Sequence, residues 1–464
     1  MESFFSKMIN IPSAFIWDYL VYILVGLGLF FTIRFGFIQF RYFIEMFRIV
    51  GEKPEGKGVS SMQAFFISAA SRVGTGNLTG VALAIATGGP GPVFWMWVVA
   101  AVGMASSFVE STLAQLYKVR DGEDFRGGPA YYIQKGLGPR WLGIVFAVLI
   151  TVSFGLIFNA VQTNTIAGAL DGAFHVNKTA VAIVLAVLTA FIIFGGLKRI
   201  VAVSQLIVPV MAGIYILIAL YVVITNISAF PGIIATIVKN AFGFEQIVGG
   251  GLGGIIITGA KRGLFTNEAG MGSAPNAAAT AHVSHPAKQG LIQTLGVFFD
   301  TFIVCTSTAF IVLLYSVTPK GDGIQVTQAA LNHHIGSWTP TFIAIAMFLF
   351  AFSSVVGNYY YGETNIEFIK TSKLWLNIYR IAVIFMVVYG CMADFQLVWD
   401  MADLFMGLMA LINLVVITLL SNVAYKVYKD YAKQRKQGLD PVFKAKNIPG
   451  LKHAETWEEE KQEA

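Results

Sequence analysis

The sequence predicts an all-α polytopic membrane protein with about 11 transmembrane helices. Of its 464 residues, 56% are hydrophobic and only 12% are charged, which is about half the charged fraction of a typical soluble protein. Apolar stretches of about 20 residues, the length that spans the hydrocarbon of a bilayer, recur along most of the chain. One of these stretches is interrupted by Ser71 to Asn77, Ser-Arg-Val-Gly-Thr-Gly-Asn, which a continuous membrane helix would disfavour.

Eleven windows along the chain are long and apolar enough to be membrane helices. The seventh contains five glycines between positions 249 and 254 and is followed by Lys261 and Arg262, so we expect two half-helices there instead of one continuous span. The predicted spans are 15–34, 61–87, 92–117, 141–170, 179–196, 200–224, 243–268, 289–316, 339–361, 375–393 and 401–424.

Basic residues alternate strongly between successive connections. One set of connections carries most of the lysines and arginines, whereas the other set holds little beyond Lys178, Lys239 and Lys320. The positive-inside rule makes the first set cytoplasmic, with the N-terminus outside and the C-terminus inside. An odd number of spans is then required, and eleven satisfies it. The basic residues lie at the ends of spans, so lipid headgroups explain the net charge of +6, and a nucleic-acid partner is rejected.

Two interruptions divide the spans into two sets of five. The first is at Ser71–Asn77, and the second is expected at Thr258–Gly263. Each set opens with its broken span, and the second set enters the membrane from the opposite side, which is the pattern of an inverted repeat with a site near the midplane. The alternative is that the glycines serve only close helix packing. The predicted division is 1–60 (an extra helix and its connection), 61–224 (first repeat), 225–424 (second repeat) and 425–464 (a charged, solvated cytoplasmic tail).

Four segments carry a family resemblance. They are Gly-Thr-Gly-Asn at 74–77, Gly-Gly-Pro-Gly at 88–91 followed by Phe-Trp-Met-Trp, Gly-Gly-Pro-Ala-Tyr-Tyr at 127–132, and Arg-Gly-Leu-Phe-Thr-Asn-Glu-Ala-Gly-Met-Gly-Ser-Ala-Pro at 262–275. In this order they resemble the signature segments of the alanine or glycine:cation symporter family, also called the sodium:alanine symporter family. The likeness runs to about residue 424 and is closest to the Gram-positive bacterial branch associated with glutamine and alanine uptake.

The resemblance implies a LeuT-type core of ten helices in a 5+5 inverted repeat, preceded by one extra helix. It also implies sodium-coupled symport of a small neutral amino acid, glutamine or alanine and also glycine, into a bacterial cell. By resemblance to LeuT-type sodium sites, the sodium ligands are expected at Ala70, Val73, Phe350, Ser353 and Ser354. Without the family pattern, serines in a membrane helix more often bond only to the preceding turn.

An amino acid substrate needs donors for its carboxylate and acceptors for its ammonium group. The half-helix that begins in the first break offers backbone N–H groups for the carboxylate. Gln162 resembles a buried family glutamine that faces the substrate, and Asn358 lies one turn after Ser354. The full expected set is Thr75, Gly76, Asn77, Gln162, Thr258, Gly259, Ser354 and Asn358. The resemblance further implies bulky aromatics at the positions of Thr258 and Asn358 in relatives restricted to alanine and glycine, so a larger pocket that admits glutamine is expected here.

The sequence supports other functions less well than sodium-coupled symport. Proton coupling through a carboxylate at depth, such as Glu110 or Asp300, is the main alternative to sodium, and Arg72 is a candidate gate partner for Asp300 or Glu268. A channel is a further alternative. No phosphate-binding Walker motif and no nucleophile–base pair stands out, so we expect neither an ATP-driven pump nor an enzyme, no cofactor besides the co-transported sodium, and no obligatory protein partner.

Overall fold

The computed structural model describes residues 2–52, 58–243, 251–316 and 323–458, and these residues are almost entirely helical. The α-helices are α1 (Glu2–Arg34), α2 (Ile38–Arg41), α3 (Phe43–Val50), α4 (Ser61–Arg72), α5 (Val81–Gly88), α6 (Gly91–Leu116), α7 (Pro129–Tyr132), α8 (Arg140–Ile150), α9 (Asn159–Phe174), α10 (Lys178–Ile193), α11 (Gly196–Thr225), α12 (Phe230–Ala241), α13 (Gly251–Asn267), α14 (Pro275–Ala278), α15 (Pro286–Phe298), α16 (Thr306–Tyr315), α17 (Ile324–Ile335), α18 (Thr339–Ile369), α19 (Lys373–Met392), α20 (Phe395–Leu419) and α21 (Ser421–Lys436). Short π- or 3-10-helical segments are η1 (Gly76–Gly80), η2 (Ile133–Leu137), η3 (Thr151–Phe158), η4 (Phe299–Cys305), η5 (Ala445–Asn447) and η6 (Glu455–Trp457), and β1 (Val119–Asp121) pairs antiparallel with β2 (Asp124–Arg126).

The predicted membrane spans are confirmed as helices. Within the described residues, eight helical runs are long and apolar enough to cross a bilayer, and two shorter apolar runs, Gly76–Gly88 and Lys178–Ile193, accompany them. Each of the eleven predicted ranges coincides with a helix or a run of consecutive helices. Residues 244–250, at the start of the seventh predicted span, lie outside the described residues.

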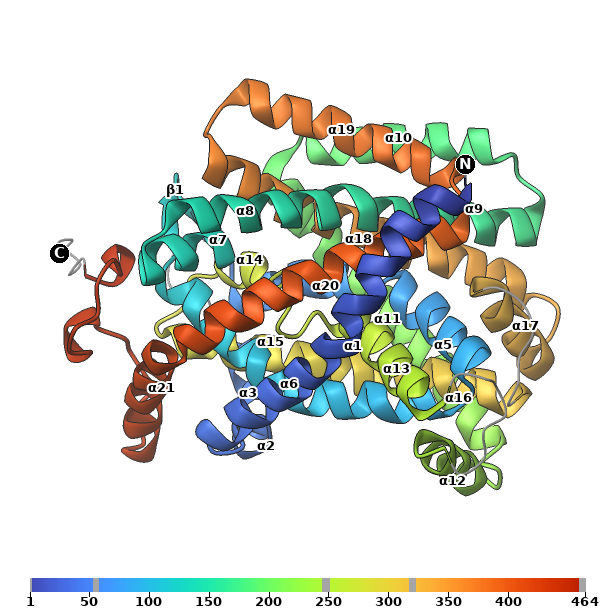
Figure 1. Cartoon of the computed structure of the whole chain (residues 1–464), viewed down its shortest axis with the longest axis horizontal. Coiled ribbons are helices and arrows are strands. Elements are labelled where there is room, and N and C mark those ends of the chain that lie inside the picture. Colours follow the sequence, from blue (N-terminus) through green and yellow to red (C-terminus); the bar gives the residue numbers. More distant parts are fainter. Residues whose placement is uncertain (1, 53–57, 244–250, 317–322, 459–464) are drawn as a thin grey trace.

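Most long helices run roughly along the longest axis of the molecule, and the start of α1 and helix α21 lie toward opposite ends of that axis (Figure 1). Helix α6 packs against α13 and α15, and α18 packs against α9 and α11, so the first and second halves of the chain are interleaved. This interleaving brings both broken helices to the centre of the bundle.

The first break is confirmed at the predicted residues. Helix α4 begins with a capping box between Ser60 and Gln63 and ends at Arg72. Val73 has non-helical backbone angles (φ −81°, ψ 89°), and helical structure resumes as η1 at Gly76. The chain therefore changes direction within the segment in which the sequence places two glycines.

The second break is not where the sequence analysis placed it. Helix α13 is continuous through Thr258 and Gly259, and the chain leaves the helix only at Glu268, whose φ is 58°. Gly270 and Gly272 also have positive φ, 81° and 87°, and these values favour glycine. The break therefore spans residues 268–274 and ends at α14.

Gly259 and Gly263 of α13 serve helix packing instead. A Cβ on Gly259 would lie 2.6 Å from the Pro92 carbonyl oxygen, and a Cβ on Gly263 would lie 3.3 Å from the Met96 Cα atom. Both contacts are with α6, so these glycines let two helices approach closely. The packing interpretation, which the sequence left open, is correct for this segment.

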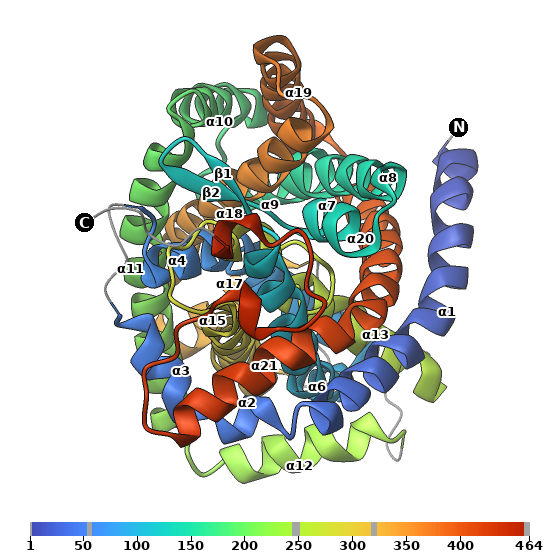
Figure 2. The ribbon, with the colours of Figure 1, turned by 90° about the vertical axis from the view of Figure 1, so that its left-hand side faces the viewer.

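The expectation of a solvated C-terminal tail is wrong for residues up to 458. The chain after α21 crosses one end of the bundle (Figure 2) and buries Phe443, Ile448 and Ala454. Phe443 N–H donates to the Ser284 carbonyl oxygen (2.8 Å), and Asp440 pairs with Lys288 (2.9 Å). Although burial opposes the effect, the hydrogen bond from Lys288 lowers the pKa of Asp440. Apolar residues spaced among the charges of the tail therefore attach it to the bundle.

Candidate functional site

The backbone groups released at the first break are bound by side chains. Gly74 N–H donates to Asn77 Oδ1 (3.0 Å), and Thr75 N–H donates to Gln162 Oε1 (3.1 Å). Asn77 also donates from Nδ2 to Asp300 Oδ1 (2.7 Å) on η4. Asn77 and Gln162 therefore hold the break in place, each through a carboxamide that is buried. These bonds satisfy polar groups that would be costly to leave unpaired inside a membrane protein.

The expected sodium ligands meet at the same break. In a continuous helix Gly74 N–H would donate to the Ala70 carbonyl, but here it donates to Asn77, so the Ala70 carbonyl loses that partner. A Cβ on Gly74 would lie 2.2 Å from Ser354 Oγ, which shows how closely α18 approaches. Ser353 and Ser354 both donate to the Phe350 carbonyl oxygen (2.8 and 3.2 Å). The hydroxyl oxygens still have lone pairs available to a cation.

A buried polar cluster connects the two breaks. Ser71 Oγ lies 2.7 Å from Glu268 Oε1 and 2.7 Å from Asn358 Oδ1. Ser273 donates to the second carboxylate oxygen of Glu268 (2.5 Å). Asn358 Nδ2 and Thr75 Oγ1 are buried without a hydrogen-bond partner in the described part of the chain. Two polar atoms from two helices are therefore left for a polar ligand to satisfy.

The second break is held by a carboxylate on α6. Glu110 accepts from Gly270 N–H (3.0 Å), Gly272 N–H (3.1 Å) and Asn413 Nδ2 (2.7 Å). Asn413 also donates to the Gly270 carbonyl oxygen (2.9 Å), and Tyr132 bonds to its side-chain oxygen. As at the first break, side chains from distant helices replace the helical hydrogen bonds that the backbone has lost.

Aromatic rings cover the breaks on one side. Phe265 of α13 stacks on Phe158 with ring centroids 4.7 Å apart, and Trp399 of α20 lies 4.7 Å from Phe265 on centroids. A Cβ on Gly76 would lie 2.8 Å from the Phe265 ring, so this glycine allows η1 to pack against α13. The aromatic layer excludes water from the first break on this side.

The two buried arginines have different partners. Arg262 pairs with Asp403 of α20 and lies over the Trp399 ring, 4.7 Å from its centroid. Arg72 donates to the Gln293 carbonyl oxygen at 3.4 Å, and its Nε and Nη2 atoms have no hydrogen-bond partner within the described ranges. The proposed gate pair of Arg72 with Asp300 or Glu268 is therefore not formed as a close ion pair among the described residues in this conformation.

Most of the expected site residues converge, but two do not. Thr75, Gly76, Asn77, Gln162, Ser354 and Asn358 gather around the first break, together with Ala70, Val73, Phe350 and Ser353. Thr258 and Gly259 lie in unbroken helix, and nine residues separate Thr258 from Asn267, which is about 13 Å along the axis. The structure therefore does not bring these two residues to either helix break.

The sequence alone predicts no site role for Ser71, Ser273, Asn413 or Phe265. The sequence suggests Glu110 only as a candidate for proton coupling and Glu268 only as a gate partner of Arg72. A usable signal was present at Glu268, because Glu-Ala-Gly-Met-Gly-Ser combines a charge with two glycines in an apolar context, as the first break does. Asn413 and Phe265 gave no comparable signal, since their roles depend on which helices pack together.

Comparison with known proteins identifies the family. The model of the sodium:alanine symporter family matches residues 1–445. The chain belongs to the sodium:alanine symporter family. It is therefore a transporter and not an enzyme, its function is sodium-coupled amino acid symport, and it is a multi-pass bacterial membrane protein, as the sequence predicted.

The symporter aligns with individual relatives over nearly the whole length of both chains. It is 91% identical to the amino-acid carrier protein AlsT of Bacillus subtilis over 100% of both chains. It is 52% identical to the probable sodium/glutamine symporter GlnT of the same organism, over 98% of this chain and 97% of the other. The sodium/alanine symporter AgcS of Methanococcus maripaludis is 37% identical over 93% of this chain and 98% of its own.

Solved structures support the fold of the symporter. The manganese transporter of Eremococcus coleocola, in complex with an aromatic bis-isothiourea compound, has a TM-score of 0.53 at 13% identity, covering 84% of this chain and 92% of that one. At this identity the likeness concerns the fold alone, and it confirms the expected LeuT-type architecture.

We predict that Gly74→Ala abolishes most sodium-driven uptake. The new Cβ would lie 2.2 Å from Ser354 Oγ and 2.9 Å from Gln162 Oε1, and overpacking of this kind costs about 1–3 kcal/mol. The measurement is uptake of labelled amino acid per amount of protein in the membrane. Gly213→Ala in α11 is the matched control, because a Cβ there meets nothing within 4 Å. Normal uptake by the Gly74 variant would contradict the close approach.

Proposed function

We propose that this symporter carries a small neutral amino acid into the cell with sodium, and that glutamine and alanine are its main substrates, with glycine also accepted. The relatives support this proposal, since GlnT is named for glutamine and AgcS for alanine, and both names include sodium. The observation that supports it most directly is the pair of unpartnered buried atoms, Asn358 Nδ2 and Thr75 Oγ1, beside the first break.

For sodium, we propose the carbonyl oxygens of Ala70, Val73 and Phe350 and the hydroxyl oxygens of Ser353 and Ser354 as ligands. Hard oxygen ligands from carbonyls and hydroxyls suit a hard alkali cation. The carbonyl of Ala70 lacks its ordinary helical partner, and Ser354 lies against Gly74. A cation bound between α4 and α18 would therefore take the place of the lost helical partner and stabilise the break.

For the substrate, we propose that the unpartnered Thr75 hydroxyl and the backbone at Gly76 receive the carboxylate and that Glu268 and Ser71 lie near the ammonium group. Asn77 and Gln162 keep their predicted place in the site, but their side chains position the break. The amide of Asn358 has one polar atom bonded to Ser71 and the other unpartnered, so it suits the side-chain amide of glutamine.

We also propose the arrangement in the membrane. Residues 61–224 and 225–424 form two inverted five-helix repeats, with the N-terminus outside and the C-terminus in the cytoplasm. The start of α1 and helix α21 lie toward opposite ends of the long axis (Figure 1), which supports termini on opposite sides of the membrane. The excess of basic residues on the side of the C-terminus supports this orientation. Residues 1–60 then supply the extra helix, and 425–464 form the cytoplasmic tail, which is attached to the bundle over its described part, up to residue 458.

Uptake into proteoliposomes tests the proposed function. Purified protein is reconstituted and given labelled glutamine, alanine or glycine with an inward sodium gradient, an inward proton gradient, or neither. We expect accumulation of glutamine and alanine only with sodium. Accumulation driven by the proton gradient alone would assign the coupling role to a buried carboxylate such as Asp300 or Glu110. Fast downhill flux that does not saturate with increasing substrate concentration would indicate a channel.

We predict that Ser354→Ala raises the sodium concentration for half-maximal uptake about tenfold, because one ligand oxygen is lost. The ratio of glutamine to alanine uptake should stay unchanged. Ser307→Ala is the matched control, since its hydroxyl also donates to the carbonyl four residues earlier (2.7 Å) but lies on α16. An unchanged sodium dependence in the Ser354 variant would refute this ligand set.

We predict that Asn358→Leu lowers uptake of glutamine roughly tenfold relative to alanine, because a neutral hydrogen bond contributes about 0.5–1.5 kcal/mol. Ser71 keeps its bond to Glu268, so the cluster stays satisfied. Competition between the two labelled substrates in one preparation provides the internal control. Equal loss of both substrates would show that Asn358 has no part in selecting the side chain.

A further inference from the structure

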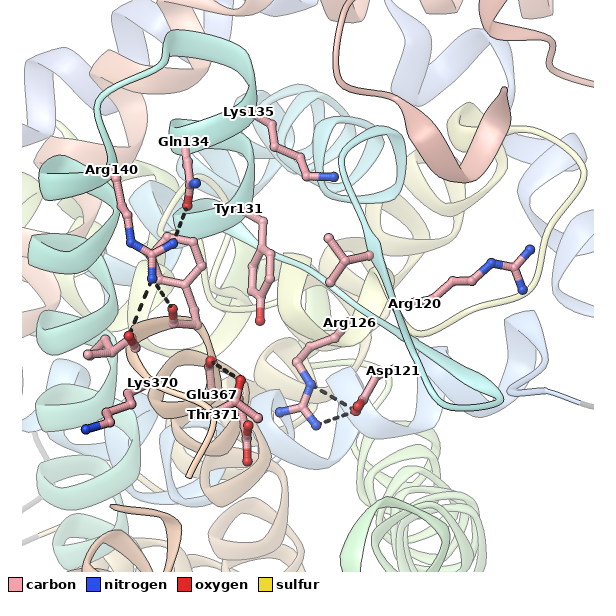
Figure 3. Close-up of a pocket in the computed structure, with 13 residues that line it drawn as sticks. Arg120, Asp121, Arg126, Tyr131, Gln134, Lys135, Arg140, Glu367, Lys370 and Thr371 are labelled. Atoms are coloured by element: carbon pink, nitrogen blue, oxygen red, sulfur yellow. Dashed lines mark hydrogen bonds and ion pairs between the residues drawn. The ribbon is translucent and has the colours of Figure 1, made fainter. Parts of the chain in front are cut away.

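A polar cavity lies at the end of the bundle that carries the C-terminal tail. Its volume is about 390 Å³, and it is bounded by the β1–β2 hairpin, α7 with η2, the start of α8 and the connection from α18 to α19. Figure 3 shows the lining side chains converging from these segments. None of them belongs to α4, η1 or α13, so the cavity is separate from the two helix breaks.

The lining of this cavity is strongly basic. Five cationic side chains border it, and only two carboxylates, Asp121 and Glu367, accompany them. The formal charge of the lining is therefore +3, or +2 when Glu455 is counted, which pairs with Lys135 (2.6 Å) from outside the lining. The cationic residues are Arg120, Arg126, Lys135, Arg140 and Lys370. A partly open cavity with this excess of positive charge attracts an anion.

Two of the arginines are held in position before any ligand arrives. Arg140 donates to the carbonyl oxygens of Phe368 and Ile369 (3.1 and 3.4 Å) and to Gln134 Oε1 (3.1 Å). Arg126 pairs with Asp121 through Nε and Nη2, whereas its Nη1 is buried and has no hydrogen-bond partner among the residues described. In Figure 3 that free end of the guanidinium points away from Asp121, toward Glu367 and Thr371.

Two tryptophans place the cavity at the depth of the lipid headgroups. Trp141 is the second residue of α8 and Trp375 the third residue of α19, and both helices begin at the cavity. Their side chains are 67% and 48% exposed. Exposed tryptophans at the ends of membrane helices mark the interface between hydrocarbon and headgroups. Leu374, 67% exposed, continues the lipid-facing surface beside Trp375.

We propose that this cavity binds a phosphate group, and that at this depth the phosphate belongs to an anionic phospholipid. Arginine donors in a fixed arrangement suit phosphate oxygens, and basic pockets between membrane helices bind anionic headgroups. The bound headgroup joins the hairpin between α6 and α8 to the connection between α18 and α19. Lipid composition then influences the stability of the transporter from outside the substrate site.

Lipid retention and thermal stability of the full-length protein test this proposal. The protein in detergent is given phosphatidylglycerol, phosphatidylcholine with the same acyl chains, or soluble glycerol phosphate, and lipid binding is read by native mass spectrometry alongside the melting temperature. We expect phosphatidylglycerol to be retained and to raise the melting temperature, and phosphatidylcholine to do neither. Stabilisation by glycerol phosphate would support the phosphate site and show that it is open to soluble esters as well.

Two variants and a matched control make the test specific. Lys370→Glu and Arg126→Gln should each weaken phosphatidylglycerol retention about tenfold. Lys370 is exposed, so its substitution leaves the fold intact even if the Arg126 variant is unstable. Lys373→Glu makes the same charge change three residues away, at an exposed position outside the cavity, and should bind as the unmodified protein does. Equal retention of both lipids, or an equal loss in the Lys373 variant, would overturn the proposal.

Discussion

The structure depends on one constraint: a helix broken inside a membrane protein must find new partners for its backbone polar groups. In this symporter the partners are side chains of distant helices. Asn77 and Gln162 receive the N–H groups of the first break, and the Glu110 carboxylate receives two N–H groups of the second. Because an unpaired buried donor costs about 1–3 kcal/mol, these few side chains decide whether the breaks exist at all.

The same bonds connect the breaks to the rest of the bundle. Gln162 joins the first break to α9, and Asn77 joins it to Asp300 on η4. Ser71 and Glu268 join the first break to the second. A ligand that forms new bonds at either break therefore changes the bonds available to several helices together. This arrangement gives a physical route by which bound sodium and bound amino acid affect one another, through a shared set of polar groups.

The sequence predicted the fold and the first break well, because an arginine and an asparagine inside an apolar stretch have few explanations other than a site. It failed at Thr258 and Gly259, where glycines and flanking charges resembled a break but serve contacts with α6 and with Asp403. Local sequence does not distinguish a glycine that packs from one that bends the chain. The attached tail was missed for a related reason, since Phe443 finds its partners near Ser284, about 160 residues earlier in the chain.

The most direct test of this account is the melting temperature and sodium-driven uptake of Glu110→Gln. The substituted amide offers one acceptor oxygen and places N–H donors opposite the N–H groups of Gly270 or Gly272, so at least one buried donor loses its partner. We expect a lower melting temperature and loss of uptake, whereas Glu123→Gln, at an exposed position in the hairpin, should behave as the unmodified protein. A Glu110→Gln variant that melts and transports normally would contradict the claim that this carboxylate holds the second break.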